Sequence, residues 1–423
     1  MSSSSDILPW TLAALLFLTG CAGAYYVAVC LAAVRFLNDR SRFRSLKKLP
    51  GHAFPPISIL KPVDGSDSDF YENIRSHALQ NYPNFELLFG AADAADPALG
   101  VVDRLSREFP HLRIQAFVCD GSGPGNRKVQ RLERLEREAR FEFLLVNDAD
   151  IRVDPNYLRE VVRPFLEPAQ GPGVGLVSCP YRARPGGTFA SLLESLSVSA
   201  EFQSQVLLTR LLGQVRFALG ATMLFRRRDL DRAGGFRALT PYLADDYQLG
   251  NRIAALGLDV VIGTHPVEIV LGDDGWREVW RRQLRWSRTV RACRPAGHLG
   301  LLFTHGSLWS LLCLAAAIGS GSFPLAAAIP GTVLILRLLA AWLIGGRCMG
   351  SSTAAGRPYL VFLADGLSFA AWLSSFFTQR IWWRKRYLRI DRDGRIVDES
   401  PAAKKEQRGR AAQQKNSDAS HTG

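Results

Sequence analysis

The sequence lacks the cysteine patterns of a zinc site or a disulfide scaffold. Its 7 cysteines are odd in number, and no two are spaced as Cys-x-x-Cys, so reduced thiols and a cytosol-facing soluble part are expected. The chain also lacks a zinc finger, an RNA-recognition motif and a regular basic stripe, so its net charge of +13 does not predict nucleic-acid binding. A P-loop and a dinucleotide-binding fingerprint are missing as well.

The positive charge instead gathers beside apolar segments. Residues 7–34 contain no charged residue, and about 20 apolar residues suffice to span a bilayer. No positive charge precedes this run, and it continues past the lipobox-like Leu18-Thr-Gly-Cys21, which disfavours a cleaved signal. Basic residues follow it. We therefore predict an N-terminal transmembrane helix at 1–37, a basic juxtamembrane linker at 38–55 and a cytosolic domain after it.

A second apolar block predicts C-terminal membrane segments at 299–380. Its apolar stretches are Leu301–Ser320, Pro324–Gly345 and Tyr359–Phe377. Three spans would place the basic residues that follow outside the cell, so we expect two spans and a third stretch that is re-entrant or interfacial. Arg337 and Asp365 lie within this block and are candidates for an intramembrane ion pair. Residues 381–423 are expected to be a basic and disordered tail.

Between the two blocks, strand and helix patterns alternate. Strands are expected at 56–60, 85–90, 112–118 and 142–146, separated by helices at 69–80, 97–109 and 128–140. This order predicts an α/β fold with a mostly parallel sheet covered by helices on both faces. Ligands then bind at the carboxyl ends of the strands. We expect a cytosolic catalytic domain over 56–272, and interfacial helices over 273–298.

Charged residues mark the carboxyl ends of these strands. Asp148 and Asp150 end a buried strand and, being two apart, point to the same side. Their repulsion is relieved by a cation, and Mg²⁺ takes one or two carboxylates plus phosphate oxygens. The alternative is an acidic turn that caps the next helix. Lys61 and Asp93 follow two other strands, and Lys128 begins a helix after a glycine-rich loop. This pattern favours a site for a nucleotide with a diphosphate, although the loop is equally consistent with a plain connection.

The second half offers three further segments. Thr188–Leu212 is a long helical stretch with few charges, near the membrane or in the core. Asp245 and Asp246 open a helix, where a carboxylate is either a partner of the helix dipole or a general base. Trp276–Trp286 mixes tryptophan and arginine, which is typical of an interfacial helix and also allows arginines to face a diphosphate.

Taken in order, these motifs resemble those of membrane glycosyltransferases of the ceramide glucosyltransferase type (family 2/21). These belong to a wider processive-synthase-like family of inverting enzymes. The resemblance extends from about Pro56 to Pro295, and its motifs are Leu60-Lys-Pro, Asp93 with Asp96-Pro-Ala, Asn126-Arg-Lys-Val129, Asp148-Ala-Asp-Ile-Arg-Val153, Gly175-Leu-Val177, Arg228-Asp-Leu-Asp-Arg-Ala-Gly-Gly235, Tyr242-Leu-Ala-Asp-Asp-Tyr247 and Arg282-Gln-Leu-Arg-Trp286. The resemblance implies a GT-A-like domain that transfers a sugar from a UDP-sugar to a hydroxyl of a membrane lipid, with a glucosylceramide-type product.

The resemblance also implies roles for the donor side of the site. Asp93 is similar to the nucleotide-binding aspartate, and Asp148 to the second aspartate, with Asp150 beside it as ligand of Mg²⁺ or Mn²⁺. Lys61 and Lys128 are expected to contact the donor.

On the acceptor side, Asp246 is similar to the catalytic aspartate, and Asp245 stands where many members carry glutamate. Arg282, Arg285 and Trp286 match a signature near the diphosphate and the acceptor. Which of Asp245 and Asp246 is the base stays open.

One departure keeps other acceptors open. Eukaryotic ceramide enzymes carry a histidine just after the Gly-Leu-Val segment, whereas this chain reads Ser178-Cys179-Pro180. The chain resembles comparably well the bacterial enzymes that add N-acetylglucosamine to hopanoid polyols (bacteriohopanetetrol). This second resemblance suggests that the protein is located in a bacterial inner membrane. A processive polysaccharide synthase would need a longer transmembrane channel. A non-enzymatic membrane scaffold would not need the full set of acidic residues.

Overall fold

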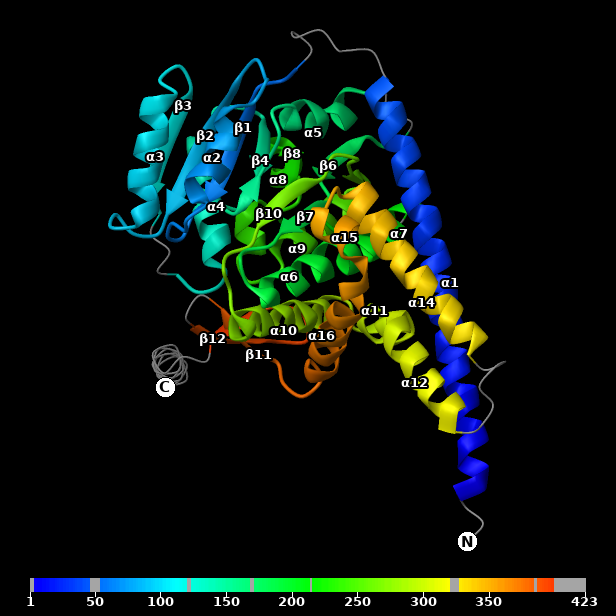
Figure 1. Cartoon of the computed structure of the whole chain (residues 1–423). Helices are drawn as coiled ribbons and strands as arrows, with labels where there is room; N and C mark the ends of the chain where they lie inside the picture. The colour runs from blue at the N-terminus through cyan, green and yellow to red at the C-terminus, as the bar shows by residue number, and fades with distance from the viewer. Residues whose placement is uncertain are drawn as a thin grey trace, which may run out of the picture.

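A seven-stranded sheet lies at the centre of the computed structural model, which describes residues 4–45, 54–119, 123–167, 171–213, 215–319, 327–383 and 386–398 (Figure 1). The strand order is β3-β2-β1-β4-β8-β6-β9. The strands are β1 (Ile57–Pro62), β2 (Phe85–Ala91), β3 (Arg113–Val118), β4 (Phe143–Val146), β6 (Val174–Ser178), β8 (Met223–Arg226) and β9 (Asp259–Ile262). Strands β3, β2, β1 and β4 are parallel, and so are β6 and β9, while β8 runs antiparallel to both of its neighbours. The expected mostly parallel sheet is confirmed.

Helices cover both faces of this sheet. Within β1, Ile59 packs into one apolar cluster and Leu60 into another, as expected for a strand buried on both sides. The first cluster is completed by α2 (Phe70–Ala78), α3 (Pro97–Glu108) and α5 (Tyr157–Leu166). The second is completed by α4 (Arg127–Glu138), α8 (Arg227–Arg232) and α9 (Asp245–Ala255). The α/β fold class is therefore confirmed.

A second, smaller sheet begins directly after the Asp-Ala-Asp motif. It has the order β5-β10-β7, formed by β5 (Ile151–Arg152), β10 (Val267–Val270) and β7 (Tyr181–Arg184). β10 pairs antiparallel with β5 and parallel with β7. The Val270 amide donates to the Asp150 carbonyl at 3.0 Å. Asp150 is thus held between the end of β4 and the second sheet.

The expected helical stretch Thr188–Leu212 is helical but not uniform. It consists of α6 (Phe189–Leu196), a π-helical segment η2 (Ser197–Phe202) and α7 (Gln203–Leu211). The Thr188 hydroxyl caps α6 by accepting from the Ser191 amide at 3.1 Å. Wide turns of this kind often occur at functional sites, and here the π-helical segment carries Glu201.

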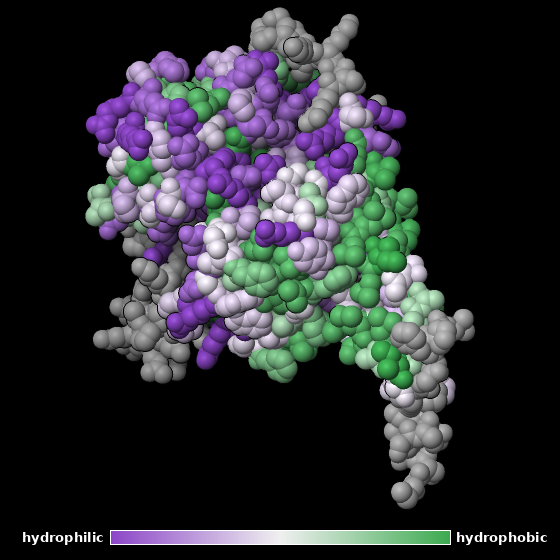
Figure 2. Space-filling model, in the orientation of Figure 1, coloured by the Kyte–Doolittle hydropathy of each residue, from purple (hydrophilic) through white to green (hydrophobic). Residues whose placement is uncertain are grey.

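Apolar helices from both ends of the chain pack together. Helix α1 (Ser4–Ser45) lies against α12 (Gly306–Gly319) and α14 (Ala328–Ala341), which continues as the π-helical η5 (Trp342–Cys348). Among the described residues, Trp10–Arg42 and Ala328–Cys348 are long and apolar enough to cross a membrane, and α12 with the segment before it, bent by 44°, would make a third span. Figure 2 shows hydrophobic side chains gathered over these helices, whereas the surface over α2 and α3 is mostly hydrophilic.

The helix boundaries change one expectation for the membrane parts and agree with another. Because α1 extends to Ser45, the first part of the expected linker 38–55 is helical, and residues 46–53 lie outside the described residues. The third apolar stretch forms α16 (Val361–Ser374), which is shorter than the helices that qualify as spans. The expected pair of Arg337 and Asp365 is confirmed: the guanidinium donates from Nε and Nη2 to the carboxylate at 2.8 and 2.6 Å.

The expectation of a disordered tail from residue 381 onward is wrong for its first part. Strands β11 (Arg380–Trp383), β12 (Arg386–Ile390) and β13 (Ile396–Asp398) form an antiparallel sheet. Leu388 and Ile390 are buried against Leu243, just before α9. The physical reason is an alternation of apolar and basic residues in β12, which gives a strand one apolar face. Residues 399–423 lie outside the described residues.

Candidate functional site

Two buried lysines surround the carboxylates at the end of β4. Lys61 is fully buried, and its Nζ donates to the backbone carbonyl of Asp148 at 2.9 Å. Burial lowers the pKa of Lys61 to about 7, against the opposing effect of Asp148 and Asp150. Nζ of Lys128 lies 2.7 Å from Oδ1 of Asp148 and 3.4 Å from Oδ2 of Asp245. Burial alone would lower the pKa of Lys128, but these two carboxylates raise it above its usual value.

The start of α4 fixes the position of Lys128. The Asn126 side chain caps this helix by accepting from the amides of Lys128 and Val129. Its own amide nitrogen donates to the Tyr242 carbonyl at 3.0 Å and lies 3.4 Å from Oδ1 of Asp245. One asparagine therefore joins the start of α4 to the segment that leads into α9.

Gly220 lies where Asp148 and Asp246 meet. Its amide donates to Oδ2 of Asp246 at 2.9 Å. A Cβ atom on Gly220 would lie 3.2 Å from that oxygen, 3.5 Å from Oδ2 of Asp148 and 3.7 Å from Nζ of Lys128. The two carboxylates, although distant in sequence, therefore face one small volume.

Buried polar side chains hold the Gly220 loop in place. Oγ of Ser178, at the end of β6, accepts from the Leu219 amide at 2.8 Å and donates to the Thr222 carbonyl at 2.6 Å. The Asn147 amide donates to the Ala221 carbonyl at 2.6 Å. Both Ser178 and Asn147 are fully buried. Side chains at the ends of β6 and β4 therefore satisfy the hydrogen-bonding groups of the loop backbone.

Asp245 and Asp246 have different surroundings. Asp245 is buried, and its carboxylate faces Lys128 and Asn126. Asp246 is half-buried and accepts from the amides of Gly220 and Tyr247, the latter at 2.7 Å. Burial, followed by the charge of Asp245, raises the pKa of Asp246 to about 6. Of the two, Asp246 borders a cavity.

Asp148 and Asp150 suit a cation that also binds phosphate. Burial, followed by the charge of Asp148, raises the pKa of Asp150 to about 6, and a cation would relieve the repulsion between the two carboxylates. Within the described ranges, no group of three or more His, Cys, Asp or Glu side chains could hold a metal ion. Two carboxylates with the remaining ligands from phosphate and water match the usual binding of Mg²⁺.

Asp93 lies at the same edge of the sheet but apart from this cluster. It follows β2, whose Gly90 pairs with Pro62 at the end of β1. The side chain is exposed, and Oδ1 accepts from the Ala95 amide at 2.9 Å. Nearby, the Asp96 carboxylate accepts from the Gly65 amide, which joins the loops after β1 and β2. An exposed carboxylate in this position is open to a ligand.

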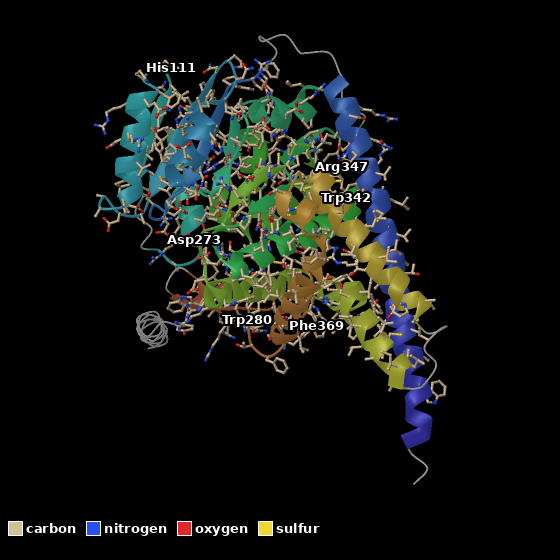
Figure 3. The ribbon with its side chains drawn as sticks, in the orientation of Figure 1. His111, Asp273, Trp280, Trp342, Arg347 and Phe369 are labelled. Carbon is tan, nitrogen blue, oxygen red and sulfur yellow. The ribbon has the colours of Figure 1, made fainter. Side chains whose placement is uncertain are left out.

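A cavity of about 370 Å³ leads from Asp246 toward the apolar helices. Its walls come from η2, α7, α16, α10 (Trp276–Cys293) and the segment that contains Leu301 and His305. Helices α10 and α16 contact each other below the main sheet, where Figure 3 labels Trp280 and Phe369. The cavity thus connects the acidic cluster with the part of the chain that carries the long apolar helices.

The structure separates the residues of the Arg-Gln-Leu-Arg-Trp motif. Trp286 borders the cavity. Arg282 instead forms a bidentate pair with the fully buried Glu194, at 2.6 Å for both contacts, and reaches Asp274 at 2.7 Å. The Arg285 guanidinium lies 6.0 Å from the centre of the Trp286 ring. Arg282 therefore links α10 to α6, and its charge is balanced by two carboxylates.

Several residues of the site were not expected from the sequence. Gly220 carries no pattern that distinguishes it from an ordinary turn residue, and the motifs that contain Asn126 and Ser178 did not indicate that these side chains hold the site together. Glu194 and Glu201 did carry a signal, because each is a charged residue in an otherwise apolar helical stretch. Such residues are seldom buried without a partner or a function.

Comparisons with known proteins agree with the sequence motifs. The profile of glycosyl transferase family 21 matches residues 15–396. Ceramide glucosyltransferase 1 of Caenorhabditis elegans is 27% identical over 219 residues, which are 51% of this chain and 46% of that protein. The β-monoglucosyldiacylglycerol synthase of Synechocystis is 22% identical over 241 residues, 55% of this chain and 47% of that protein. The chain spans about half the length of the curated relatives it matches.

Among solved structures, a mannosyltransferase from Pyrobaculum calidifontis in complex with GDP-Man and Mn²⁺ has 19% sequence identity and a TM-score of 0.44. The match covers 86% of this chain and 99% of that one.

Proposed function

The chain belongs to glycosyl transferase family 21, and we propose that it transfers a sugar from a UDP-sugar to a hydroxyl of a membrane lipid, as a ceramide glucosyltransferase does. The names of the matched relatives support this class of reaction, since several are ceramide glucosyltransferases and one is a glucosyldiacylglycerol synthase. The resemblance of the motifs implies that the reaction inverts the configuration at the anomeric carbon.

The position of Asp246 is the observation that carries the proposal. On one side Asp246 meets Asp148 around Gly220, and on the other it borders the cavity that leads to the apolar helices. A base that joins a diphosphate site to a lipid site must contact both. An aspartate buried for a structural reason alone would not need the second contact.

In the proposed reaction, Asp246 removes the proton from the lipid hydroxyl. The oxygen attacks the anomeric carbon, the bond from that carbon to the phosphate oxygen breaks, and UDP leaves with the bonding electrons. A pKa near 6 suits this role, because the carboxylate is ionised at neutral pH and still accepts a proton readily. Asp245 acts as a positioning residue, since it holds Lys128 beside Asp148.

On the donor side, Lys61 and Lys128 balance the charge around the diphosphate, and Asp93 accepts hydrogen bonds from the nucleoside. Asp148 and Asp150 would hold Mg²⁺ or Mn²⁺ together with diphosphate oxygens. Such an ion stabilises the charge that develops on the leaving group. Because Arg282 is already paired with Glu194 and Asp274, we assign it to the support of α10, and keep Arg285 and Trp286 as the motif's contacts to the substrates.

We further propose that the catalytic part faces the cytosol, in a bacterial inner membrane. Support comes from the basic residues that follow the first apolar run, such as Arg40 and Arg42.

Replacement of Asp246 by asparagine tests the proposal. The Asp246→Asn variant should bind UDP as the wild type does but lose sugar transfer by about 100- to 10,000-fold, the usual contribution of general base catalysis. Asp103→Asn, an exposed aspartate on α3, is the matched control and should keep full activity. Normal turnover by Asp246→Asn would refute the assignment of the base.

The products should be analysed by mass spectrometry in the same assay. A single sugar on a ceramide or on a hopanoid polyol identifies the acceptor, whereas a polymer would contradict the proposal in favour of a polysaccharide synthase.

A further inference from the structure

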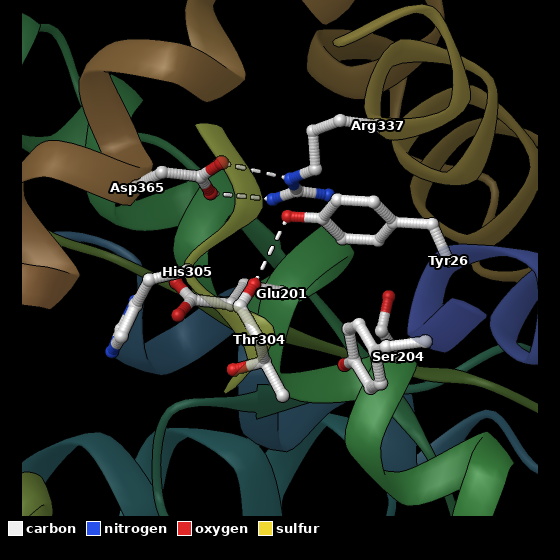
Figure 4. A pocket seen from close by; sticks show the side chains of 8 residues that line it. Tyr26, Glu201, Ser204, Thr304, His305, Arg337 and Asp365 are labelled. Carbon is white, nitrogen blue, oxygen red and sulfur yellow. Dashed lines mark hydrogen bonds and ion pairs between the residues drawn. The ribbon is translucent and has the colours of Figure 1, made fainter. Parts of the chain in front are cut away.

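Glu201 borders two separate groups of residues, and the proposed reaction gives this side chain no role. It is on the π-helical segment η2 and borders both the cavity beside Asp246 and a small cluster of polar residues from the apolar helices. The cluster includes Tyr26 of α1, Arg337 of α14 and Asp365 of α16 (Figure 4). Glu201 thus comes from the catalytic part but lies among residues of the membrane part.

The cluster holds two carboxylates, those of Glu201 and Asp365, and one guanidinium, that of Arg337. Arg337 is engaged by Asp365 through two hydrogen bonds, and Asp365 also accepts from the Ser307 hydroxyl. The Tyr26 hydroxyl donates to the Thr304 carbonyl at 3.0 Å. No hydrogen bond among the described residues joins Arg337 to Glu201. The arginine therefore positions α16, while Glu201 keeps its capacity to accept from a ligand.

Glu201 is only partly satisfied. The Ser368 hydroxyl donates to Oε2, and Oε1 accepts no hydrogen bond within the part of the chain that the structure describes. Ser368 borders the same cavity as Glu201. The side chain is half-buried, so Oε1 is available to a molecule that occupies the cavity.

A second polar side chain borders the same cavity as Glu201. Gln283 of α10 borders the cavity and is only 7% exposed. Its amide nitrogen has no hydrogen-bond partner within the described ranges. A buried amide left in this state is costly, about 1–3 kcal/mol. An acceptor and a donor without partners in one apolar cavity indicate a ligand with polar groups beyond the reacting one.

We infer that Glu201 and Gln283 select the acceptor, by binding a second hydrogen-bonding group of a lipid whose reacting hydroxyl faces Asp246. This rests on the proposed function and specifies its substrate class. The lipid carries another hydroxyl or an amide near the reacting hydroxyl, as sphingoid amides and polyols do. A lipid whose only donor is the reacting hydroxyl, such as a diacylglycerol, can still accept from Gln283 through an ester carbonyl, but it leaves Oε1 of Glu201 without a donor and is disfavoured.

The test uses the full-length protein in lipid nanodiscs with a UDP-sugar. One acceptor pair is a ceramide and the same ceramide methylated at its amide and secondary hydroxyl. The other is a hopanoid polyol and its analogue with a single unblocked hydroxyl. For each pair, kcat/KM is measured and expressed as the ratio of parent lipid to analogue. Wild type should give a ratio of about 10 to 100 for the pair it uses, as expected for loss of hydrogen bonds to buried groups.

Variants of Glu201 then separate recognition from support of the fold. Glu201→Met should bring the ratio close to one, and Glu201→Gln, which keeps an acceptor, should restore part of it. Glu278→Met, an exposed glutamate on α10, is the control and should keep the wild-type ratio.

Three outcomes overturn the inference. A wild-type ratio near one would do so without any variant. Equal losses for parent and analogue in Glu201→Met would show that Glu201 only supports the fold. Binding of the UDP-sugar without transfer to any lipid would refute the proposed function itself, and this result is distinct from the other two.

Discussion

Replacement of Gly220 by alanine should slow the reaction without loosening the fold. The added Cβ would lie 3.2 Å from Oδ2 of Asp246, closer than an ordinary contact, and 3.5 Å from Oδ2 of Asp148. The Asp246 carboxylate must then move by a few tenths of an ångström. The φ angle of Gly220 is not positive, so alanine brings no backbone strain.

The size of the effect follows from this displacement. A misplacement of about 1 Å at a reacting group costs about 100-fold in rate, so a few tenths should cost about 3- to 10-fold in kcat. Since the Gly220 amide can still donate to Asp246, the midpoint of thermal unfolding should stay within a few degrees of wild type. The affinity for UDP, measured by calorimetry, should change much less than kcat.

The matched control is Gly100→Ala on α3, where nothing lies within 4 Å of the added atom. This variant should keep wild-type kcat and gain about 0.5–1 kcal/mol of stability, because glycine is unfavourable inside a helix. Wild-type kcat in Gly220→Ala would mean that Asp148 and Asp246 do not meet around this residue in the working protein. A large fall in unfolding temperature would mean that the loop, and not the base, is the sensitive element.

Two further predictions concern charge. Burial raises the pKa of Asp246 to about 6, and only the ionised form is a base, so kcat/KM should fall as the pH drops through about 6 and level off above it. Because the pKa of Asp150 is also raised to about 6, the pH profile reports a value shared by the two carboxylates. A profile that stays flat down to pH 5 would contradict the assignment of Asp246 as the base. Arg337→Met should destabilise the protein by about 3–5 kcal/mol, because it leaves Asp365 buried without its ion-pair partner. The double variant Arg337→Met with Asp365→Leu should recover much of this loss. Thermal unfolding in detergent measures both variants, and an equal loss of stability in the single and the double variant would be incompatible with a buried ion pair.

The first half of the sheet could be predicted because its signals are local. Strands such as Ile57–Pro62 are mostly apolar and alternate with amphipathic helices, which leaves few arrangements other than parallel pairing. The insertion of β8 between β4 and β6 could not be predicted, since pairing between distant strands leaves no mark on either one. Strand β12 was missed because its basic residues obscure the apolar alternation of Leu388 and Ile390.

The acidic residues of the site were easier to find than the roles of the basic ones. Asp148 and Asp246 each follow a recognisable pattern, a strand end and a helix start. Arg282 belongs to an equally recognisable motif, yet its partner Glu194 is 88 residues away, and only the fold brings the two together. An arginine motif alone does not reveal whether its charge is balanced by the protein or left for a ligand.

The construction of the cavity has a practical consequence for anyone who wishes to crystallise a water-soluble fragment. A fragment that ended after α10 would keep the whole acidic cluster and could still bind nucleotide. It would lose Trp372 and Ser368, which line the cavity from α16. If the cavity holds the acceptor as proposed, such a fragment should release its sugar to water, because α16 forms part of the cavity wall beside Asp246.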